Sequence, residues 1–104
     1  MTSEPGGGRR EAGAAPTDAL ARCRKEIERI DADIVRLLAD RVRIGREIGS
    51  LKKAAGRPTI DPAREAEVIR RAGELARDAG LLDEPVRAIF WQVIGLSRRA
   101  QVDE

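Results

Sequence analysis

The fold of this chain is decided by residues 18–55, which read DALARCRKEIERIDADIVRLLADRVRIGREIGSLKKAA. Their apolar side chains recur at steps of three and four residues, the spacing of one face of a helix. These apolar positions are Leu20, Cys23, Ile27, Ile30, Ile34, Leu37, Ile44, Ile48 and Leu51. Thr17 is the predicted N-cap, and the breaker Gly56-Arg57-Pro58 ends the segment. The stretch therefore predicts one long amphipathic helix.

Two shorter helices are expected after this break. The second begins at Asp61, an N-cap followed by Pro62, and ends near Ala79 at a glycine. The third begins near Asp83 or Glu84, with Pro85 in its first turn, and runs to about Val102. Its apolar row consists of Val86, Ile89, Phe90, Val93 and Leu96. No segment shows the alternation of a strand, so the predicted class is all-α, with three helices per chain.

The length of the first helix favours a second chain. At about 1.5 Å per residue, ~37 residues span roughly 55 Å, whereas a compact domain of about 100 residues has a radius of gyration of only about 13 Å. The apolar face continues to Leu51, beyond what two short helices can cover. We therefore predict an intertwined antiparallel homodimer. A first helix bent or broken at Gly45 or Gly49 is the alternative.

Composition also favours a partner chain. Hydrophobic residues make up 41% of the sequence and charged residues 37%, but aromatic residues only 2%, namely Phe90 and Trp91. Aromatic side chains supply much of the bulk of ordinary cores, so the core of this short chain is thin and needs burial from a partner. The net charge is only +2, and no stacking aromatics interleave the cations, so no nucleic-acid partner is expected.

Missing residue types exclude several kinds of site. The chain has no His and a single cysteine, Cys23, which excludes an intramolecular disulfide, a zinc–histidine site and a Ser–His pair. No metal site built from cysteine or histidine is therefore expected. Residues 1–16 are rich in Gly, Ala and Pro and contain no apolar run long enough for a signal peptide or a membrane span. We predict a disordered tail over residues 1–16, one domain over residues 17–104, a cytoplasmic location and no membrane partner.

Polar residues interrupt the apolar face of the first helix. Continuing the heptad from Leu37 places Arg41 on that face, where an unpaired cation is costly. Lys52 returns to within about 20° of the same face, roughly 16 Å further on. Arg24 lies about 25 Å before Arg41 and ~100° around the helix, so it can serve the same site only from the other protomer. The alternative is that these cations lie on a solvated surface.

The shorter helices carry further polar side chains. Ser97 falls in the apolar row of the third helix, and Gln101 follows four residues later. Asp61 and Glu65 flank Arg64 in the first turn of the second helix, where carboxylates suit the helix dipole and an arginine opposes it. Each pattern alone is ordinary near a helix end. Together, these cations, carboxylates, hydroxyl and amide suit the binding of a compact dianion without covalent catalysis.

These polar positions belong to longer blocks of sequence. The blocks are RKEIERID at 24–31, LLADR at 37–41, IG at 48–49 followed by Lys52, RP at 57–58, DPARE at 61–65, and Phe90, Ser97 and Gln101. In these blocks and their spacing, residues 18–101 resemble the all-helical, type II chorismate mutase family. Pro62 and the N-terminal tail depart from the minimal family pattern.

The resemblance implies an isomerase that converts chorismate to prephenate in one pericyclic step, without a cofactor, in aromatic amino acid biosynthesis. It implies that the two carboxylates of the substrate are bound by Arg41 and Arg64, by Ser97, and by Arg24 of the opposite protomer. Each active site would then combine residues from both chains of the homodimer.

The same resemblance implies the remaining roles. Lys52 and Gln101 would hydrogen-bond the ether oxygen of the bond that breaks. Glu65 and the region of Asp61 would meet the ring hydroxyl. The residues expected to be catalytic are therefore Lys52, Gln101, Glu65 and Arg41.

Other functions stay open on the sequence alone. An aminodeoxychorismate mutase would use the same scaffold, because Asp61 and Glu65 also suit an ammonium group. An isochorismate-pyruvate lyase is a further relative, although the acidic segment looks like the mutase version. A non-enzymatic helical dimerisation module would account for the long helix, but not for Arg41, Ser97 and Gln101 on apolar rows.

Overall fold

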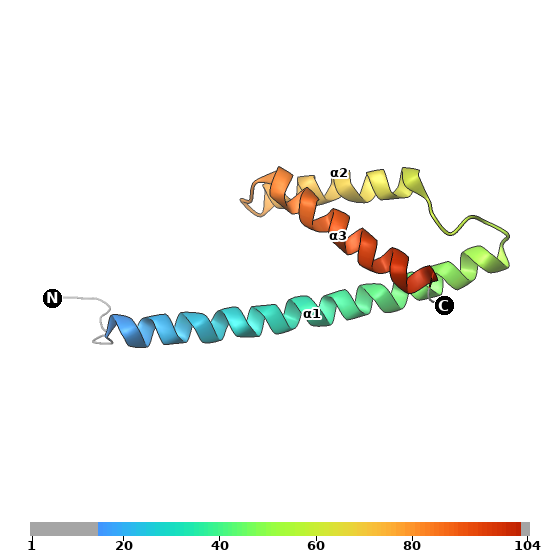
Figure 1. Ribbon diagram of the computed structural model, residues 1–104. Coiled ribbons are helices and arrows are strands. Elements are labelled where there is room, and N and C mark those ends of the chain that lie inside the picture. The colour runs from blue at the N-terminus through green and yellow to red at the C-terminus, as the bar shows by residue number, and fades with distance from the viewer. Residues whose placement is uncertain (1–14, 103–104) are drawn as a thin grey trace. The chain divides into compact units, whose positions relative to one another are not determined.

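The computed structural model describes residues 15–102, which divide into two units at residues 36 and 37. Three helices make up most of the described range: α1 (Pro16–Ala54), α2 (Pro62–Asp78) and α3 (Asp83–Val102) (Figure 1). No strand occurs within these residues. The prediction of an all-α chain with one long and two shorter helices is confirmed. Most of the expected N-terminal tail, residues 1–14, lies outside the described residues.

Helix α1 begins slightly earlier than its sequence signals indicate. Pro16 is its first residue, and the carbonyl of Ala15 accepts from the backbone N–H groups of Asp18 at 2.9 Å and Ala19 at 3.1 Å. Proline suits the first helical position because its missing N–H would have no helical partner there. Thr17 therefore lies inside the first turn, and its prediction as the N-cap was wrong.

The same helix continues without interruption through Gly45 and Gly49 to Ala54. The structure therefore does not show the alternative of a first helix broken at these glycines. At the end of α1, Gly56 has a φ of +68°, and the backbone N–H of Arg57 donates to the carbonyl of Lys52 at 2.8 Å. A glycine in this left-handed conformation closes a helix by satisfying its last carbonyl groups.

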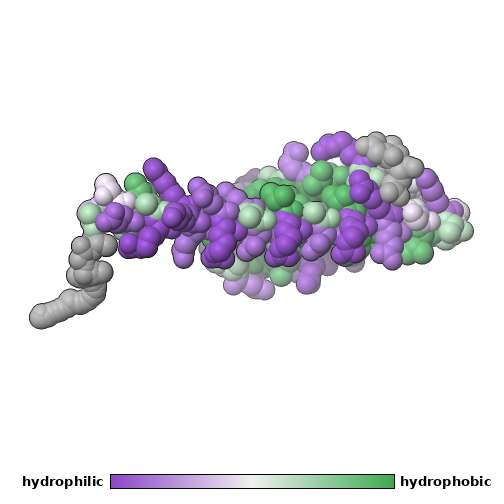
Figure 2. All heavy atoms as spheres, turned by 90° about the horizontal axis from the view of Figure 1, so that it is seen from below, coloured by the Kyte–Doolittle hydropathy of each residue, from purple (hydrophilic) through white to green (hydrophobic). Residues whose placement is uncertain are grey.

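The predicted apolar face of α1 is exposed in the single chain. This holds for Leu20, Cys23, Ile27, Ile30, Ile34, Leu37, Ile44, Ile48 and Leu51. Figure 2 shows apolar surface, in green, that remains uncovered between charged side chains. Aliphatic side chains repeated along a helix face are normally buried against another element. No helix of the described residues is long and apolar enough to cross a membrane.

Helices α2 and α3 form a hairpin whose ends match the sequence signals. Asp61 caps α2 by accepting the backbone N–H of Arg64 at 3.1 Å, and Pro62 is the first helical residue. At the other end Gly80 has a φ of +78°, and the N–H of Leu81 donates to the carbonyl of Ala76 at 2.8 Å. This is the left-handed glycine end expected near Ala79.

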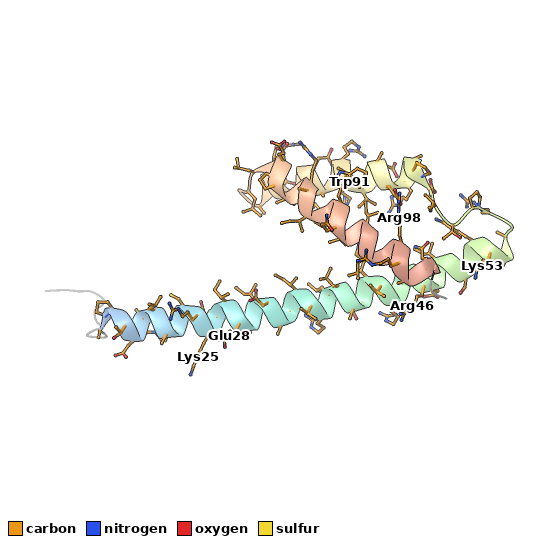
Figure 3. The ribbon with its side chains drawn as sticks, in the orientation of Figure 1. Lys25, Glu28, Arg46, Lys53, Trp91 and Arg98 are labelled. Atoms are coloured by element: carbon orange, nitrogen blue, oxygen red, sulfur yellow. The ribbon has the colours of Figure 1, made fainter. Side chains whose placement is uncertain are left out.

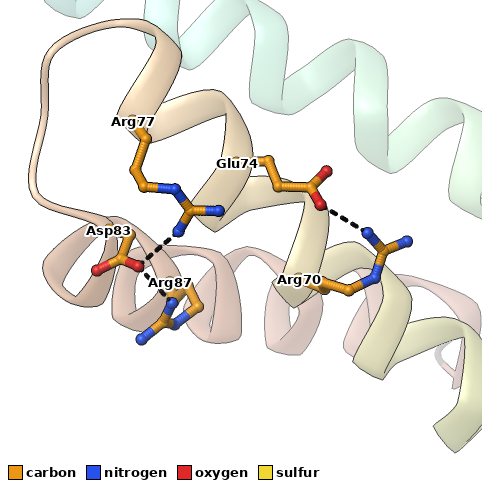
Figure 4. A network of polar contacts seen from close by, with 5 residues as sticks. All are labelled: Arg70, Glu74, Arg77, Asp83 and Arg87. Atoms are coloured by element: carbon orange, nitrogen blue, oxygen red, sulfur yellow. Dashed lines mark hydrogen bonds and ion pairs between the residues drawn. The ribbon is translucent and has the colours of Figure 1, made fainter.

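Small side chains let α2 and α3 approach closely. The buried apolar residues in the described range are Ala72, Ala76, Ile94 and Ala100. Asp83, at the start of α3, accepts hydrogen bonds from Arg77 at 2.7 Å and Arg87 at 2.9 Å and so ties the hairpin together (Figure 4). Burial opposes ionisation of Asp83, but these two guanidinium groups outweigh it and hold its pKa below the ordinary value.

Candidate active site

A cavity of about 280 Å³ lies within residues 37–102, where the C-terminal part of α1, the start of α2 and the end of α3 meet. This volume is close to the lower end of the range for small-molecule sites. Seven of the eight residues predicted for the site line it: Arg41, Lys52, Asp61, Arg64, Glu65, Ser97 and Gln101. The side chains of Ile44, Ile48, Val68 and Ile94 supply apolar walls.

Arg41 and Ser97 join α1 to α3 at one side of the cavity. The Nη1 atom of Arg41 donates to Oγ of Ser97 at 2.8 Å. Ser97 is buried, with only 8% of its surface exposed, and Arg41 is half-buried. The heptad placed Arg41 on the inner face of the helix, and its cation has a buried hydroxyl partner there. Further N–H donors of the guanidinium remain available for a ligand.

Two glycines of α1 lie against Gln101 of α3. A Cβ on Gly45 would lie 3.7 Å from Nε2 of Gln101, and one on Gly49 only 3.3 Å from Cγ of Gln101. Both glycines are buried. The bare backbone at Gly49 therefore lets Gln101 of α3 come close to α1, whereas a Cβ at Gly45 would make only ordinary contacts.

Lys52 is held in place by the loop that follows α1. Its Nζ donates to the backbone carbonyl of Thr59 at 2.9 Å, and Thr59 also lines the cavity. An ammonium group has three donors, so this bond leaves two N–H groups for a ligand. The carbonyl thus orients the cation without neutralising it.

The first turn of α2 contributes two further residues, whose side chains already have partners. One oxygen of Asp61 accepts the N–H of Arg64 as the helix cap. The Arg64 side chain is exposed and pairs with Glu67 at 3.1 Å. One oxygen of Asp61 therefore caps the helix, as expected for an Asp-Pro helix start, and Asp61 also lines the cavity.

Glu65 is paired with an arginine that the sequence analysis missed. The Nε of Arg98 donates to Oε2 of Glu65 at 2.7 Å, and its Nη2 donates to Oε1. Arg98, labelled in Figure 3, extends from α3 toward α2 and lines the cavity beside Ser97. These hydrogen bonds hold the pKa of Glu65 below its ordinary value of 4.5, and the charges of Arg98 and Lys52 add to the effect against the opposing effect of burial.

The cavity has an excess of positive charge. Arg41, Lys52, Arg64 and Arg98 are its cations, against the carboxylates of Asp61 and Glu65. This balance suits a small anion with more than one negative group. No cluster of three metal-ligating side chains occurs in residues 15–102.

Arg24 is the predicted site residue that the structure does not bring to the cavity. It lies in the N-terminal part of α1 and is exposed. It is not among the residues that line the cavity. The single chain thus assembles seven of the predicted residues, and the role of Arg24 stays a prediction.

Comparison with known proteins gives a consistent family match. The family described as chorismate mutase type II matches residues 23–102. A chorismate mutase of Methanocaldococcus jannaschii is 30% identical over 77 residues, which cover 74% of this chain and 77% of that protein. A conserved hypothetical protein from Pyrococcus furiosus has a structure with a TM-score of 0.66 and 38% sequence identity, over 85% of this chain and 99% of that chain.

Some relatives are much longer than this chain. A 3-dehydroquinate dehydratase of Pyrobaculum aerophilum is 36% identical over 70 residues, or 67% of this chain but only 23% of that protein. Another curated relative is matched over 17% of its length. The chain therefore spans less than a quarter of these two relatives, and a name that describes a whole long protein need not describe the matched segment.

Proposed function

Because this chain belongs to the type II chorismate mutase family, we propose that it catalyses the rearrangement of chorismate to prephenate. The observation that carries this proposal is the cavity, where Arg41, Lys52, Ser97 and Gln101 meet at one site. Chorismate is a compact dianion, and the excess of cations in the cavity suits it.

The reaction is an intramolecular pericyclic rearrangement and needs no nucleophile, metal or cofactor. Its main requirements are to hold the enolpyruvyl arm over the ring and to stabilise charge at the ether oxygen as its bond to carbon stretches. Side chains held by hydrogen bonds before the substrate arrives meet both requirements, because little reorganisation is then needed.

Lys52 and Gln101 are proposed to contact the ether oxygen. Lys52 has the stronger effect, since a fixed ammonium near the developing negative charge favours the transition state over the ground state. Its bond to the carbonyl of Thr59 at 2.9 Å supports this role, because it restricts a long, flexible side chain.

Arg41 and Arg64 are proposed to bind the two carboxylates, with Ser97 assisting. The bond from Arg41 to Ser97 fixes the direction of the Arg41 guanidinium. Glu65 and the Asp61 region are proposed to face the ring hydroxyl, because a carboxylate accepts a hydrogen bond from that group.

The protein is further proposed to act as an intertwined antiparallel homodimer. The exposed aliphatic face of α1, from Leu20 to Leu51, supports this, since a second copy would cover it. The partner's α1 would then contribute Arg24 as an additional carboxylate ligand. The cytoplasmic location stays a prediction, to be tested by cell fractionation.

The deciding experiment assays the purified full chain with chorismate, 4-amino-4-deoxychorismate and isochorismate. The expected result is turnover of chorismate to prephenate without added metal or cofactor. Turnover of isochorismate with release of pyruvate would instead make the chain a lyase. No turnover of any of the three, in a folded sample, would contradict an enzymatic role and favour the helical dimerisation module.

Subunit mixing tests the contribution of Arg24. Arg24→Ala and Lys52→Ala are each expected to be nearly inactive alone. If Arg24 acts across the dimer, unfolding and refolding the two variants together gives heterodimers with one intact site, and about a quarter of wild-type activity returns at equal mixing. No recovery, in a sample shown to contain heterodimers, would contradict the contribution of Arg24 across the dimer, and full activity of Arg24→Ala alone would place Arg24 outside the site.

A further inference from the structure

We propose that Arg98 is a specificity-determining residue, which makes the site prefer a substrate with a neutral hydroxyl on the ring over one with an ammonium group there. This inference rests on the proposed mutase function and narrows its substrate class. It follows from the pairing of Arg98 with Glu65, the carboxylate that is proposed to meet the ring substituent.

The pair is built into the cavity from two helices. Glu65 follows Arg64 on α2, and Arg98 follows Ser97 on α3, so each partner lies beside a residue proposed to bind substrate. The Glu65 side chain is 15% exposed and the Arg98 side chain 45% exposed. Glu65 is therefore the less exposed partner, and Arg98 the more exposed one. The two-point contact also fixes the plane of the carboxylate.

The pairing changes what Glu65 can attract. Hydrogen bonds from Arg98 keep Glu65 ionised, as its lowered pKa indicates, but the guanidinium charge beside it cancels much of its negative potential. A carboxylate has about four lone-pair positions, and Arg98 uses two of them. Glu65 can thus still accept a hydrogen bond from a hydroxyl group.

An ammonium group at the same place meets a different balance. Its attraction to Glu65 is offset by repulsion from the adjacent Arg98, and Lys52 adds further positive charge close enough to act on Glu65. A neutral hydroxyl carries no net charge, so these cations do not repel it. The pair therefore discriminates by repulsion, and Arg98 acts through Glu65 as a positioning residue rather than as a catalytic one.

The test measures kcat/KM for chorismate and for 4-amino-4-deoxychorismate in the wild type, Arg98→Leu and Arg98→Lys. The wild type is expected to prefer chorismate. Arg98→Leu should lower the ratio of kcat/KM for chorismate to kcat/KM for 4-amino-4-deoxychorismate by about tenfold or more, because Glu65 regains its negative potential. Arg98→Lys keeps the charge and should retain most of the preference.

A matched control is available on α2. Arg70 pairs with Glu74 at 2.8 Å outside the cavity (Figure 4), so Arg70→Leu also breaks an arginine–glutamate pair. It should leave the substrate ratio unchanged. If Arg98→Leu fails to fold, as judged by circular dichroism, Arg98→Gln removes the charge while keeping a polar side chain and answers the same question.

Two further measurements separate action through Glu65 from direct contact with substrate. In a Glu65→Gln background, Arg98→Leu should no longer alter the substrate ratio. In the Arg98→Leu protein, the acid limb of the kcat/KM profile for chorismate should move to higher pH, because the pKa of Glu65 returns toward its ordinary value.

The outcomes distinguish this inference from the proposed function. A wild type inactive on both substrates overturns both. If the wild type turns over chorismate but Arg98→Leu has the same substrate ratio as the wild type, only the role of Arg98 is overturned. A wild type that prefers 4-amino-4-deoxychorismate overturns that role as well. Equal loss of activity on both substrates in Arg98→Leu, unaltered by Glu65→Gln, would instead make Arg98 a ligand for the carboxylates that both substrates share.

Discussion

Arg41 on α1 donates a hydrogen bond of 2.8 Å to the hydroxyl of Ser97 on α3, across 56 positions of sequence. This bond connects two helices at the cavity and orients a cation that is proposed to bind a substrate carboxylate. Ser97 is buried, so its hydroxyl has few alternative partners.

Ser97→Ala is expected to weaken both stability and substrate binding. Loss of one hydrogen bond should lower the free energy of unfolding by about 1 kcal/mol, and KM should rise several-fold because Arg41 becomes less constrained. Urea unfolding and steady-state kinetics measure the two effects. Ser50→Ala, at an exposed position of α1 that does not line the cavity, is the control and should change neither quantity.

Lys52→Ala is expected to lower kcat far more than it lowers stability. Removing a fixed cation next to a developing negative charge typically costs about 10² in rate or more, whereas loss of its bond to Thr59 should cost about 1 kcal/mol of folding free energy. The neighbouring Lys53, labelled in Figure 3, does not line the cavity, and Lys53→Ala is the matched control. An unchanged kcat in Lys52→Ala would refute the proposed role of Lys52.

Gly45→Ala and Gly49→Ala should separate stability from activity. Both replace a helical glycine, which favours the helix by up to about 1 kcal/mol. At Gly45 the added Cβ makes ordinary contacts, at 3.7 Å and beyond, so stability should rise and kcat should hold.

At Gly49 the added Cβ lies 3.3 Å from Cγ of Gln101, which must shift. We expect kcat to fall several-fold in Gly49→Ala, because Gln101 is proposed to contact the ether oxygen. Thermal unfolding and kinetics of both variants provide the check. Equal kcat values in the two variants would show that the position of Gln101 does not matter for the reaction.

Acidification should remove the contribution of Glu65 to stability, and comparison with Glu65→Gln separates it from that of other carboxylates such as Asp83. Because the pKa of Glu65 is lowered in the folded state, its contribution is complete above the ordinary value of 4.5 and is lost as pH falls through the lowered value. At neutral pH, Glu65→Gln should therefore have a Tm a few degrees below that of the wild type. This difference should shrink as the pH falls below 4.5, and a constant difference down to pH 3 would contradict the assignment.

Much of the candidate site follows from local rules. Arg41 breaks an apolar repeat, Ser97 and Gln101 lie four residues apart on one face, and Asp61 to Glu65 form one helix turn, so their neighbours are set by helix geometry. Arg98 gave no such signal. Its partner Glu65 is 33 positions away, and an arginine next to Ser97 looks like any other surface cation until α2 and α3 are packed.

The sequence by itself determined the three helices and their ends at Asp61, Gly56 and Gly80, because caps, breakers and apolar periodicity act within a few residues. The tertiary structure decided how closely the helices approach and which charges pair, namely Arg41 with Ser97, Lys52 with the Thr59 carbonyl and Arg98 with Glu65. These contacts depend on where helix faces meet in space. Long side chains at the same periodic position can point to solvent or to a partner, and only the packing of the helices selects between them.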